Sequence, residues 1–327
     1  MMNLAIGIDI GGTNTVFGIV DSEGNCLEKK SILTTDYDIP EGLVKAIFEQ
    51  LQVMLISLKK VNVVGIGIGA PNGNYYNGTI EYAPNLKWKG VVNLVKLFYK
   101  YFDVPVFVTN DANAAAIGEM TYGVAKGVKD FVVVTLGTGL GSGIVCNGKL
   151  VYGSDGFAGE LGHTIVEENG RECACGRKGC LETYVSATGI VRTAQLMLEK
   201  SSKPSLLREV SAEKISAKAI AESAKKGDEL AQDIFDFTAK KLGFSLANLV
   251  AITCPEMIVL FGGLANAGES IIEPTKKYME QNLLRIFKEK VSIVPSGLKG
   301  GNAAILGASS LVWNELKKEN FEKVELN

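Results

Sequence analysis

The residues with the clearest chemical purpose are one histidine and three cysteines within an 18-residue stretch. His163 is the only histidine of the chain, and Cys173, Cys175 and Cys180 follow it in a glycine-rich segment. Imidazole nitrogen and thiolate sulfur are the ligands that Zn²⁺ prefers, and four of them complete its tetrahedral shell. The spacing therefore predicts a structural zinc site that is closed to water. The alternative is three reduced thiols that bind no metal and a histidine whose hydrogen bonds are satisfied by the protein.

A second pattern places a carboxylate at the end of an apolar run, followed by glycines and hydroxyls. The segment Asp9-Ile10-Gly11-Gly12-Thr13-Asn14 separates two apolar runs, so it predicts a hairpin turn. Glycine lets backbone N–H groups approach phosphate oxygens, and Asp9 is able to hold Mg²⁺ through water. The turn suits the phosphate tail of a nucleotide, although a plain hairpin with a local acceptor has the same sequence.

The chain repeats this pattern far downstream. Phe131–Leu136 is an apolar run, a turn containing Thr138 and Gly139 follows, and a second apolar run comes after the turn. Two hairpins of one design indicate a duplicated fold, in which the two turns would face each other across a cleft. Neither turn is a P-loop, because no Gly-Lys-Ser/Thr follows, and neither opens a dinucleotide-binding βαβ unit.

Asn110 and Asp111 lie directly between an expected buried strand and an alanine-rich segment. Asp111 is able to accept the proton of an attacking hydroxyl there, and a helix N-terminus favours nearby negative charge. The competing interpretation is that both residues only cap the helix.

Other polar residues could read a polyol. Glu160 and Glu182 flank the expected zinc loop, and Asn85 lies in the first third of the chain. Several acceptors converging on one ligand would bind the hydroxyls of a sugar. Taken singly, each residue is equally well explained as solvated surface.

These side chains need a scaffold, and the hydrophobic pattern predicts alternating strands and helices. Val61–Ile68 is a continuous apolar run typical of a buried strand, whereas Glu41–Leu58 has helical spacing. The same reasoning predicts strands at 4–10, 104–108 and 257–261, and helices at 91–102, 111–120, 190–200, 216–226, 228–251, 271–287 and 303–318.

Length and composition narrow the class of protein. A chain of 327 residues predicts about two domains, and therefore a cleft between lobes. With 46% hydrophobic residues, 21% charged residues and a net charge of -2, the composition excludes disorder, collagen and coiled coil. A pI near 5.7 supplies no basic footprint, so we expect no nucleic-acid partner. We see no secretory signal and no membrane span, which favours a cytoplasmic protein without a membrane partner.

Together these motifs resemble one family, the sugar kinases and repressors called ROK, and within it the ATP-dependent glucokinases. The resemblance covers essentially the whole chain. The segments that carry it are Asp9–Thr13, Asn110–Ala114, Leu136–His163, Cys173–Glu182 and Phe261–Gly263.

The resemblance implies a fold and a reaction. The fold is the two-lobed α/β architecture of actin and hexokinase, a duplicated ribonuclease H-like fold with a cleft between the lobes. We place a smaller N-terminal lobe at residues 1–111, completed by a C-terminal helix at about 302–327. A larger lobe with the zinc loop covers residues 112–301. The implied reaction is phosphorylation of glucose at O6 by ATP, with Mg²⁺ and a structural Zn²⁺ as cofactors.

The resemblance also implies roles for residues. Asp111 would take the proton from the O6 hydroxyl as it attacks the γ-phosphate of MgATP. His163 would place one nitrogen on zinc and the other toward a sugar hydroxyl. The residues expected to hold the sugar are Asn85, Asn110, Asp111, Glu160, His163 and Glu182. Those expected to hold the nucleotide are Asp9, Gly11, Gly12, Thr13, Asn14, Thr138, Gly139, Gly262 and Gly263, the last two near the adenosine.

The acceptor stays open at this point. The segment Ala70-Pro71-Asn72-Gly73 differs from the Pro-Gly form common in the family, and it lies where the sugar loop is expected. Other members of the family phosphorylate mannose, allose, fructose, N-acetylmannosamine or N-acetylglucosamine with nearly the same residues. No motif tells whether polyphosphate could replace ATP.

Two other classes compete with the kinase. A sugar-responsive repressor of this family carries a DNA-binding domain before the first turn, and Asp9 comes too early in the sequence to leave room for one. A catalytically silent sugar-binding protein would not need Asp111 and both phosphate turns. Because members of the family are commonly dimers or tetramers, we expect a homo-oligomer.

Overall fold

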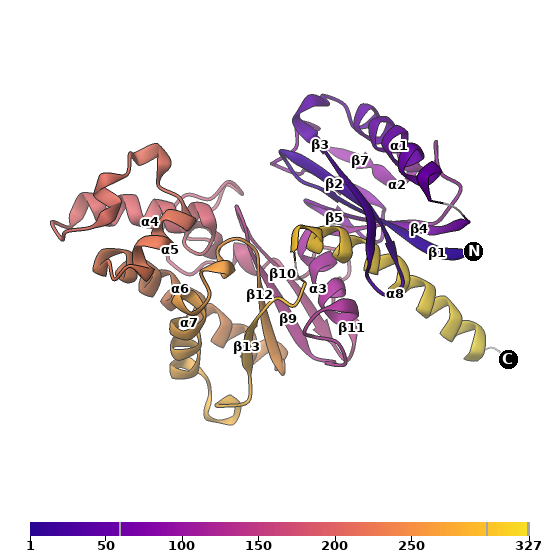
Figure 1. Cartoon of the computed structure of the whole chain (residues 1–327). Helices are drawn as coiled ribbons and strands as arrows, with labels where there is room; N and C mark the ends of the chain where they lie inside the picture. Colours follow the sequence, from indigo (N-terminus) through magenta and orange to yellow (C-terminus); the bar gives the residue numbers. More distant parts are fainter. Residues whose placement is uncertain (59, 299, 326–327) are drawn as a thin grey trace. The chain divides into compact units, whose positions relative to one another are not determined.

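The computed structural model describes residues 1–58, 60–298 and 300–325, and in it the chain forms two compact units (Figure 1). Unit 1 comprises Met1–Gly127, Leu150–Ala158 and Gly297–Asn327, and unit 2 comprises Val128–Lys149 and Gly159–Ser296. The sequence analysis placed the break at Asp111. The units divide after Gly127 instead, because the helix that begins at Asp111 packs against the C-terminal helix of unit 1.

A five-stranded sheet forms the centre of unit 1, in the order β3-β2-β1-β4-β8. The first three strands are antiparallel neighbours, while β4 and β8 run parallel to β1. The strands are β1 (Met2–Ile10), β2 (Asn14–Asp21), β3 (Cys26–Leu33), β4 (Val61–Ala70) and β8 (Val106–Asn110). The helices of the unit are α1 (Pro40–Ser57), α2 (Leu94–Phe98), α3 (Asp111–Tyr122) and α8 (Ala303–Glu325).

The two faces of this sheet differ in side-chain size, and that difference decides what packs on each. Successive residues of a strand point to opposite faces. Ile6 and Ile8 join the hydrophobic core formed with α1, whereas Gly7 lies on the other face. A Cβ atom at Gly7 would lie 2.2 Å from the carbonyl oxygen of Ile305 in α8, so only glycine admits the helix backbone this close. Figure 1 shows α1 and α8 beside the strands of this sheet.

Unit 2 repeats the design. Its sheet has the order β11-β10-β9-β12-β13, in which β9 and β10 form an antiparallel hairpin and β12 and β13 run parallel to β9. The expected duplication is therefore confirmed. The strands are β9 (Phe131–Leu136), β10 (Leu140–Cys146), β11 (Lys149–Leu150), β12 (Met257–Phe261) and β13 (Ser292–Pro295), and the helices are α4 (Ala187–Lys200), α5 (Ala217–Lys225), α6 (Glu229–Thr253) and α7 (Glu269–Asn282).

Short elements complete the chain. A small sheet joins β5 (Gly73–Asn74), β6 (Thr79–Glu81) and β7 (Val91–Asn93). Single 3₁₀ turns occur at Thr34–Asp36, Leu161–His163, Leu181–Thr183, Leu206–Glu209, Ala212–Lys214, Ala265–Ala267, Arg285–Phe287 and Gly300–Asn302.

Two predicted helices are shorter than expected. The helix predicted at 91–102 is wrong at both ends. Val91–Asn93 pairs with β6, the Asn93 side chain then caps α2 by accepting the N–H of Lys96 at 2.9 Å, and α2 ends at Phe98. The helix predicted at 271–287 ends at Asn282, since Leu283 is extended. The C-terminal helix predicted to about 327 is described as far as Glu325, and its last two residues lie outside the described part.

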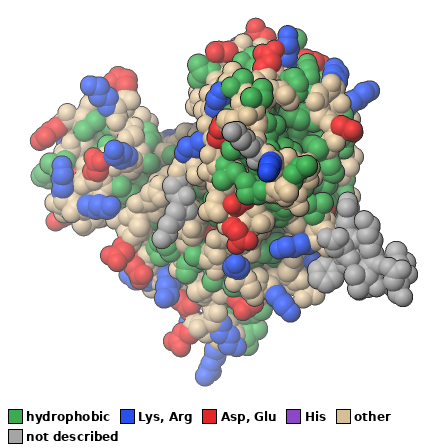
Figure 2. All heavy atoms as spheres, turned by 45° about the vertical axis from the view of Figure 1, so that its right-hand side comes forward, with side chains coloured by type: hydrophobic (Ala, Val, Ile, Leu, Met, Phe, Trp, Pro, Cys, Tyr) green, Lys and Arg blue, Asp and Glu red, His purple; other side chains and the backbone are tan. Residues whose placement is uncertain are grey.

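The surface is mixed in charge. On the face shown in Figure 2, basic and acidic side chains are interspersed, as a net charge of -2 on 34 basic and 36 acidic residues would suggest. Within the described ranges, no helix combines the length and the apolar character needed to cross a membrane.

Candidate active site

Two carboxylates meet at one edge of the sheet in unit 1. Asp9 lies at the end of β1, and Asp111 follows the last residue of β8. The strand between them is β4, and Gly69 of that strand pairs with Asp9 on one side and with Thr109 on the other. A Cβ atom at Gly69 would lie 3.5 Å from Asp9 Oδ1 and 3.6 Å from the Cα atom of Asp111. Glycine at this position therefore leaves space between the two acids.

The surroundings of these acids raise their pKa values. Burial raises the pKa of Asp9 to about 7, and the neighbouring charge of Asp111 acts in the same direction. Asp111 as a whole residue is exposed, but its carboxyl group lies among protein atoms that desolvate it, and this raises its pKa although backbone N–H groups oppose the shift. A carboxylate with a raised pKa is a stronger base than an ordinary one.

Asn110 and Asp111 do cap α3. The side-chain Oδ1 atom of each accepts the N–H of Ala112 at 2.8 Å. Among the hydrogen bonds of the described residues, the cap uses Oδ1 of Asp111 and not Oδ2. Capping and proton transfer are therefore compatible in the same side chain.

The first glycine turn lies against the loop that carries Asn85. The turn is closed by the N–H of Gly11, which donates to the carbonyl of Asn14 at 2.9 Å. A Cβ atom at Gly12 would lie 2.6 Å from the carbonyl oxygen of Asn85, so the two backbones touch. Thr13 and Asn14 are exposed at the turn, where their side chains are open to a ligand.

The segment at 70–73, where the resemblance predicts a sugar loop, is held by Asn72, a residue to which the sequence analysis gave no role. Asn72 adopts a left-handed conformation with φ 50°, which favours glycine and asparagine. Its Nδ2 atom donates to the carbonyl of Glu81 at 2.9 Å and to that of Tyr82 at 3.4 Å. These bonds tether the segment that leads to Asn85.

In unit 2 the second glycine turn is braced by a carboxylate. The N–H of Leu140 donates to Glu182 Oε2 at 3.1 Å, and the N–H of Ala187 donates to the carbonyl of Gly137 at 2.8 Å. A Cβ atom at Gly139 would lie 2.2 Å from the same Oε2 atom. Glu182 therefore reaches the turn only because residue 139 has no side chain.

The Gly262-Gly263 pair lies beside the same turn. Gly262 has φ 103°, and a Cβ atom there would lie 2.8 Å from the carbonyl oxygen of Leu136, the last residue of β9. The N–H of Leu264 donates to that carbonyl at 3.0 Å. Unit 2 thus gathers Thr138, Gly139 and both of these glycines at one end of its sheet.

The four expected metal ligands converge. One ligand atom from each of His163, Cys173, Cys175 and Cys180 lies within 4.8 Å of the other three. The Sγ atoms of Cys175 and Cys180 are 3.6 Å apart, and His163 Nδ1 is 3.8 Å from Cys173 Sγ. A tetrahedron with metal–sulfur bonds of about 2.3 Å has edges of about 3.8 Å, so the spacing fits Zn²⁺, and it is far too long for a disulfide.

The electrostatics of the cluster suit a cation. Burial alone would raise the pKa of the Cys175 thiol, but hydrogen bonds from Arg177 and from the neighbouring thiols lower it to about 6. A thiolate is the form of cysteine that binds metal. The residues present therefore fit a structural Zn²⁺.

The loop that carries these four residues, 163–180, is called the metal loop below. It contacts the residues that are expected to hold the sugar. His163 turns Nδ1 toward Cys173, and its Nε2 lies 3.9 Å from Glu160 Oε2. The Cys173 thiol lies 3.6 Å from Glu182 Oε1, so Glu182 contacts both the cluster and the second turn.

Each unit thus gathers one set of candidate residues. Unit 1 brings together Asp9, Gly12, Asn85, Asn110 and Asp111, and unit 2 brings together Thr138, Gly139, Glu160, His163 and Glu182. That the two sets form one site stays a prediction. Sequence reasoning missed the role of Gly69, although the alternation of Gly65, Gly67 and Gly69 signals a strand face without side chains.

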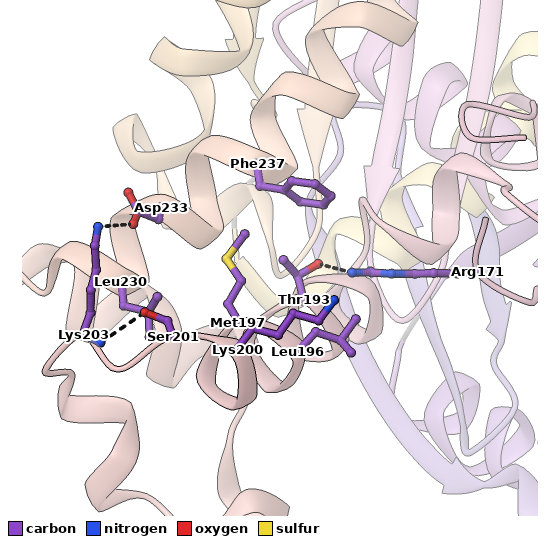
Figure 3. A pocket seen from close by; sticks show the side chains of 10 residues that line it. All are labelled: Arg171, Thr193, Leu196, Met197, Lys200, Ser201, Lys203, Leu230, Asp233 and Phe237. Atoms are coloured by element: carbon purple, nitrogen blue, oxygen red, sulfur yellow. Dashed lines mark hydrogen bonds and ion pairs between the residues drawn. The ribbon is translucent and has the colours of Figure 1, made fainter.

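A cavity of about 550 Å³ lies elsewhere in unit 2, and none of the predicted site residues line it (Figure 3). Its wall includes Arg171, whose guanidinium donates to Thr193 Oγ1 at 2.9 Å and to the carbonyl of Thr183 at 2.7 Å. Arg171 therefore fastens the metal loop to α4.

Fold and site together define a class. Two α/β units of the same strand order, each with a glycine turn at its hairpin, form the actin/hexokinase-like fold of the sugar kinases. The sequence pattern of the ROK family matches residues 5–315. The chain belongs to the ROK family.

Individual relatives agree with this assignment. A glucokinase of Halalkalibacterium halodurans is 35% identical over 323 residues, which are 96% of this chain and 97% of that protein. A ROK family glucokinase from Streptomyces griseus, solved in complex with glucose and AMPPNP, is 35% identical and superimposes with a TM-score of 0.79 over 94% of this chain and 98% of that one. A xylose repressor of Caldicellulosiruptor bescii is 31% identical, covering 84% of this chain and 69% of that protein.

Proposed function

We propose that this chain phosphorylates glucose at O6 with MgATP. The enzyme class is ATP-dependent sugar kinase, and the glucokinase relatives, matched over nearly their whole length, support a hexose as acceptor. The observation that carries the proposal is the pair of acids at one sheet edge, Asp9 beside the first phosphate turn and Asp111 on the N-terminus of α3.

Unit 1 supplies the acid–base chemistry. Asp111 accepts the proton of the O6 hydroxyl while that oxygen attacks the γ-phosphorus, and ADP leaves with the electrons of the broken P–O bond. A raised pKa makes Asp111 a better acceptor for that proton at neutral pH. Asp9 would hold the Mg²⁺ of the nucleotide through water, and Asn85 and Asn110 would bind sugar hydroxyls.

Unit 2 supplies neutral donors to the phosphates. The backbone of the turn at Thr138 and Gly139 presents N–H groups, and the Thr138 hydroxyl adds a further donor. Gly262 and Gly263 leave room for the adenosine. Closure of the lobes would exclude water, which would otherwise compete with the sugar as acceptor.

The metal loop orients part of the sugar site. His163, Cys173, Cys175 and Cys180 would hold Zn²⁺, which when bound would link the two ends of the loop in addition to the backbone hydrogen bonds that the loop already makes. His163 then presents Nε2 beside Glu160, and Glu182 is held between the loop and the second turn. We propose that these three side chains bind sugar hydroxyls.

Release of ADP in the presence of MgATP tests the proposal. The panel comprises glucose, mannose, fructose, allose, N-acetylglucosamine and N-acetylmannosamine, with polyphosphate as a second donor. We expect the highest kcat/KM with glucose and ATP. A higher value with another sugar would change the assigned acceptor and leave the mechanism as proposed. No turnover of any sugar by folded protein would contradict the proposal that the chain is a kinase.

A sugar-responsive regulator is the second candidate, because a xylose repressor is among the relatives. Binding of a sugar without turnover of any sugar on the panel would favour it. We also propose a homo-oligomer, a dimer or a tetramer, which light scattering on purified protein would measure.

A further inference from the structure

A buried carboxylate lies at the place where the chain leaves unit 1 and returns to it. Glu119 begins the last turn of α3 and is 0% exposed. The chain first passes from unit 1 to unit 2 after Gly127, crosses back for Leu150–Ala158, and returns finally at Gly297. The first and the last of these connections come close to the end of α3.

One oxygen of Glu119 holds both connections. Its Oε2 atom accepts the N–H of Val124 at 2.9 Å and the N–H of Gly297, 178 positions away in sequence, at 3.3 Å. Hydrogen bonds to a buried, charged acceptor are stronger than neutral ones. The outgoing and the returning segment are thus fastened to the same atom.

The close packing around the Glu119 carboxylate requires glycine at two positions. A Cβ atom at Gly123 would lie 1.9 Å from Glu119 Oε2, and a Cβ atom at Gly297 would lie 2.7 Å from the backbone nitrogen of Val124. Neither glycine has a positive φ, so what each position requires is space and not backbone freedom. Two glycines therefore let the carboxylate and both segments approach.

The same helix carries the proposed base. Asp111 begins α3 and Glu119 follows eight residues later, about 12 Å along the helix axis. The helix is anchored in unit 1, because a Cβ atom at Gly118 would lie 2.9 Å from the Cα atom of Gly307 in α8. The two connections are therefore attached to a helix that is fixed in unit 1 and that also positions Asp111.

We propose that Glu119 is a positioning residue for phosphoryl transfer, because its carboxylate sets the path of the two segments that join the units at the end of α3. The proposal rests on the kinase reaction, in which the lobes must close around both substrates. Loss of the carboxylate would leave the sugar and nucleotide groups in place but loosen the joint. We therefore expect loss of the carboxylate to lower kcat more than it changes KM.

The test compares three variants with the wild type and has a readout independent of activity. Glu119→Ala removes the acceptor, Glu119→Gln keeps one side-chain oxygen, and Gly123→Ala displaces the carboxylate without removing it. Hydrogen exchange of the Val124 and Gly297 amides is measured by NMR, together with kcat and KM for the best sugar. Lys126→Ala is the matched control, since it shortens an exposed side chain of the same connection and leaves the backbone as it is.

For Glu119→Ala and Gly123→Ala we expect both amides to exchange at least about 10-fold faster, kcat to fall about 10-fold, and KM for the sugar to change less than about 3-fold. Glu119→Gln should recover part of both losses. Unchanged exchange in folded Glu119→Ala, or an equal fall in kcat for Lys126→Ala, would overturn the proposal. Wild-type protein inactive on every sugar would instead contradict the kinase, and the exchange rates would still test the role of Glu119 in the joint.

Discussion

The two glycine turns share a scaffold and differ in charge. Each follows the strand that starts a hairpin, in sheets of equivalent order. The penultimate residue of β1 is Asp9, whereas that of β9 is Thr135, whose hydroxyl accepts the N–H of Gly141 at 3.1 Å. Likewise β8 is followed by Asp111 and β13 by Ser296.

This difference teaches how a duplicated fold divides the work of a kinase. A proton acceptor and a magnesium site need carboxylates, but carboxylates close to the phosphates of ATP would repel them. Neutral hydroxyl and N–H donors carry no such penalty. Unit 1 therefore has acids at its strand ends, where unit 2 has Thr135 and Ser296. The carboxylate at the second turn, that of Glu182, comes from outside the hairpin and accepts the N–H of Leu140.

The largest expected effect comes from the acid after β8. Asp111→Asn should lower kcat by about 10²–10⁴, because Asn cannot accept the O6 proton but can still cap α3. Glucose binding, measured by calorimetry, should change little. The equivalent change in unit 2, Ser296→Ala, should lower kcat less than about 3-fold. If Asp111→Asn kept more than a tenth of the turnover, the assigned base would be wrong.

The next effect concerns the metal loop, which has no counterpart in unit 1 among the described residues. Cys180→Ser should abolish a zinc content of about one ion per chain and lower kcat/KM for the sugar about 10–100-fold, because His163 loses its support. Elemental analysis and steady-state kinetics measure the two quantities. Cys146→Ser, in β10 of the same unit, is the control and should leave the metal bound. Wild-type protein that is folded and free of metal would contradict the site.

Within the second turn, two neighbouring glycines should behave differently. Gly139→Ala should lower kcat/KM about 10-fold, since the new Cβ would lie 2.2 Å from Glu182 Oε2 and displace that carboxylate. Gly137→Ala should have an effect below about 2-fold, because nothing lies within 4 Å of its Cβ position. Equal effects would show that the turn needs flexible backbone and not the contact with Glu182.

The smallest expected effect is the pH-dependent contribution of Asp9 to the stability of the fold. The pKa of Asp9 is about 7 in the folded chain and about 4 in an unfolded one, so between these values the folded state holds more protons. Its ionisation therefore lowers stability progressively as pH rises from about 4 to 7. Asp9→Asn should raise Tm by about 1–3 °C at pH 8 and by less at pH 5. Thr135→Ser should show no such pH dependence, and a gain for Asp9→Asn that is larger at pH 5 would contradict the assignment.

Local patterns were enough for much of the fold. Both hairpins, the apolar strands β4 and β12 and the helices α1, α3 and α6 were predicted from periodicity and from glycine turns. The prediction failed at 91–102, where the pairing of β7 with β6 and the cap at Asn93 outweigh an apolar pattern that also suits a helix.

The candidate site divides in the same way. The sequence alone determined the candidate metal ligands, which lie within one short loop, and the cap at Asn110, which depends on adjacent residues. The tertiary structure decided that Asp9 and Asp111 share a sheet edge, that Glu182 reaches Gly139, and that Glu119 holds Gly297. Strand register and burial depend on residues far apart in the chain. Together they bring side chains that are distant in sequence into contact, and burial raises the pKa values of the two acids.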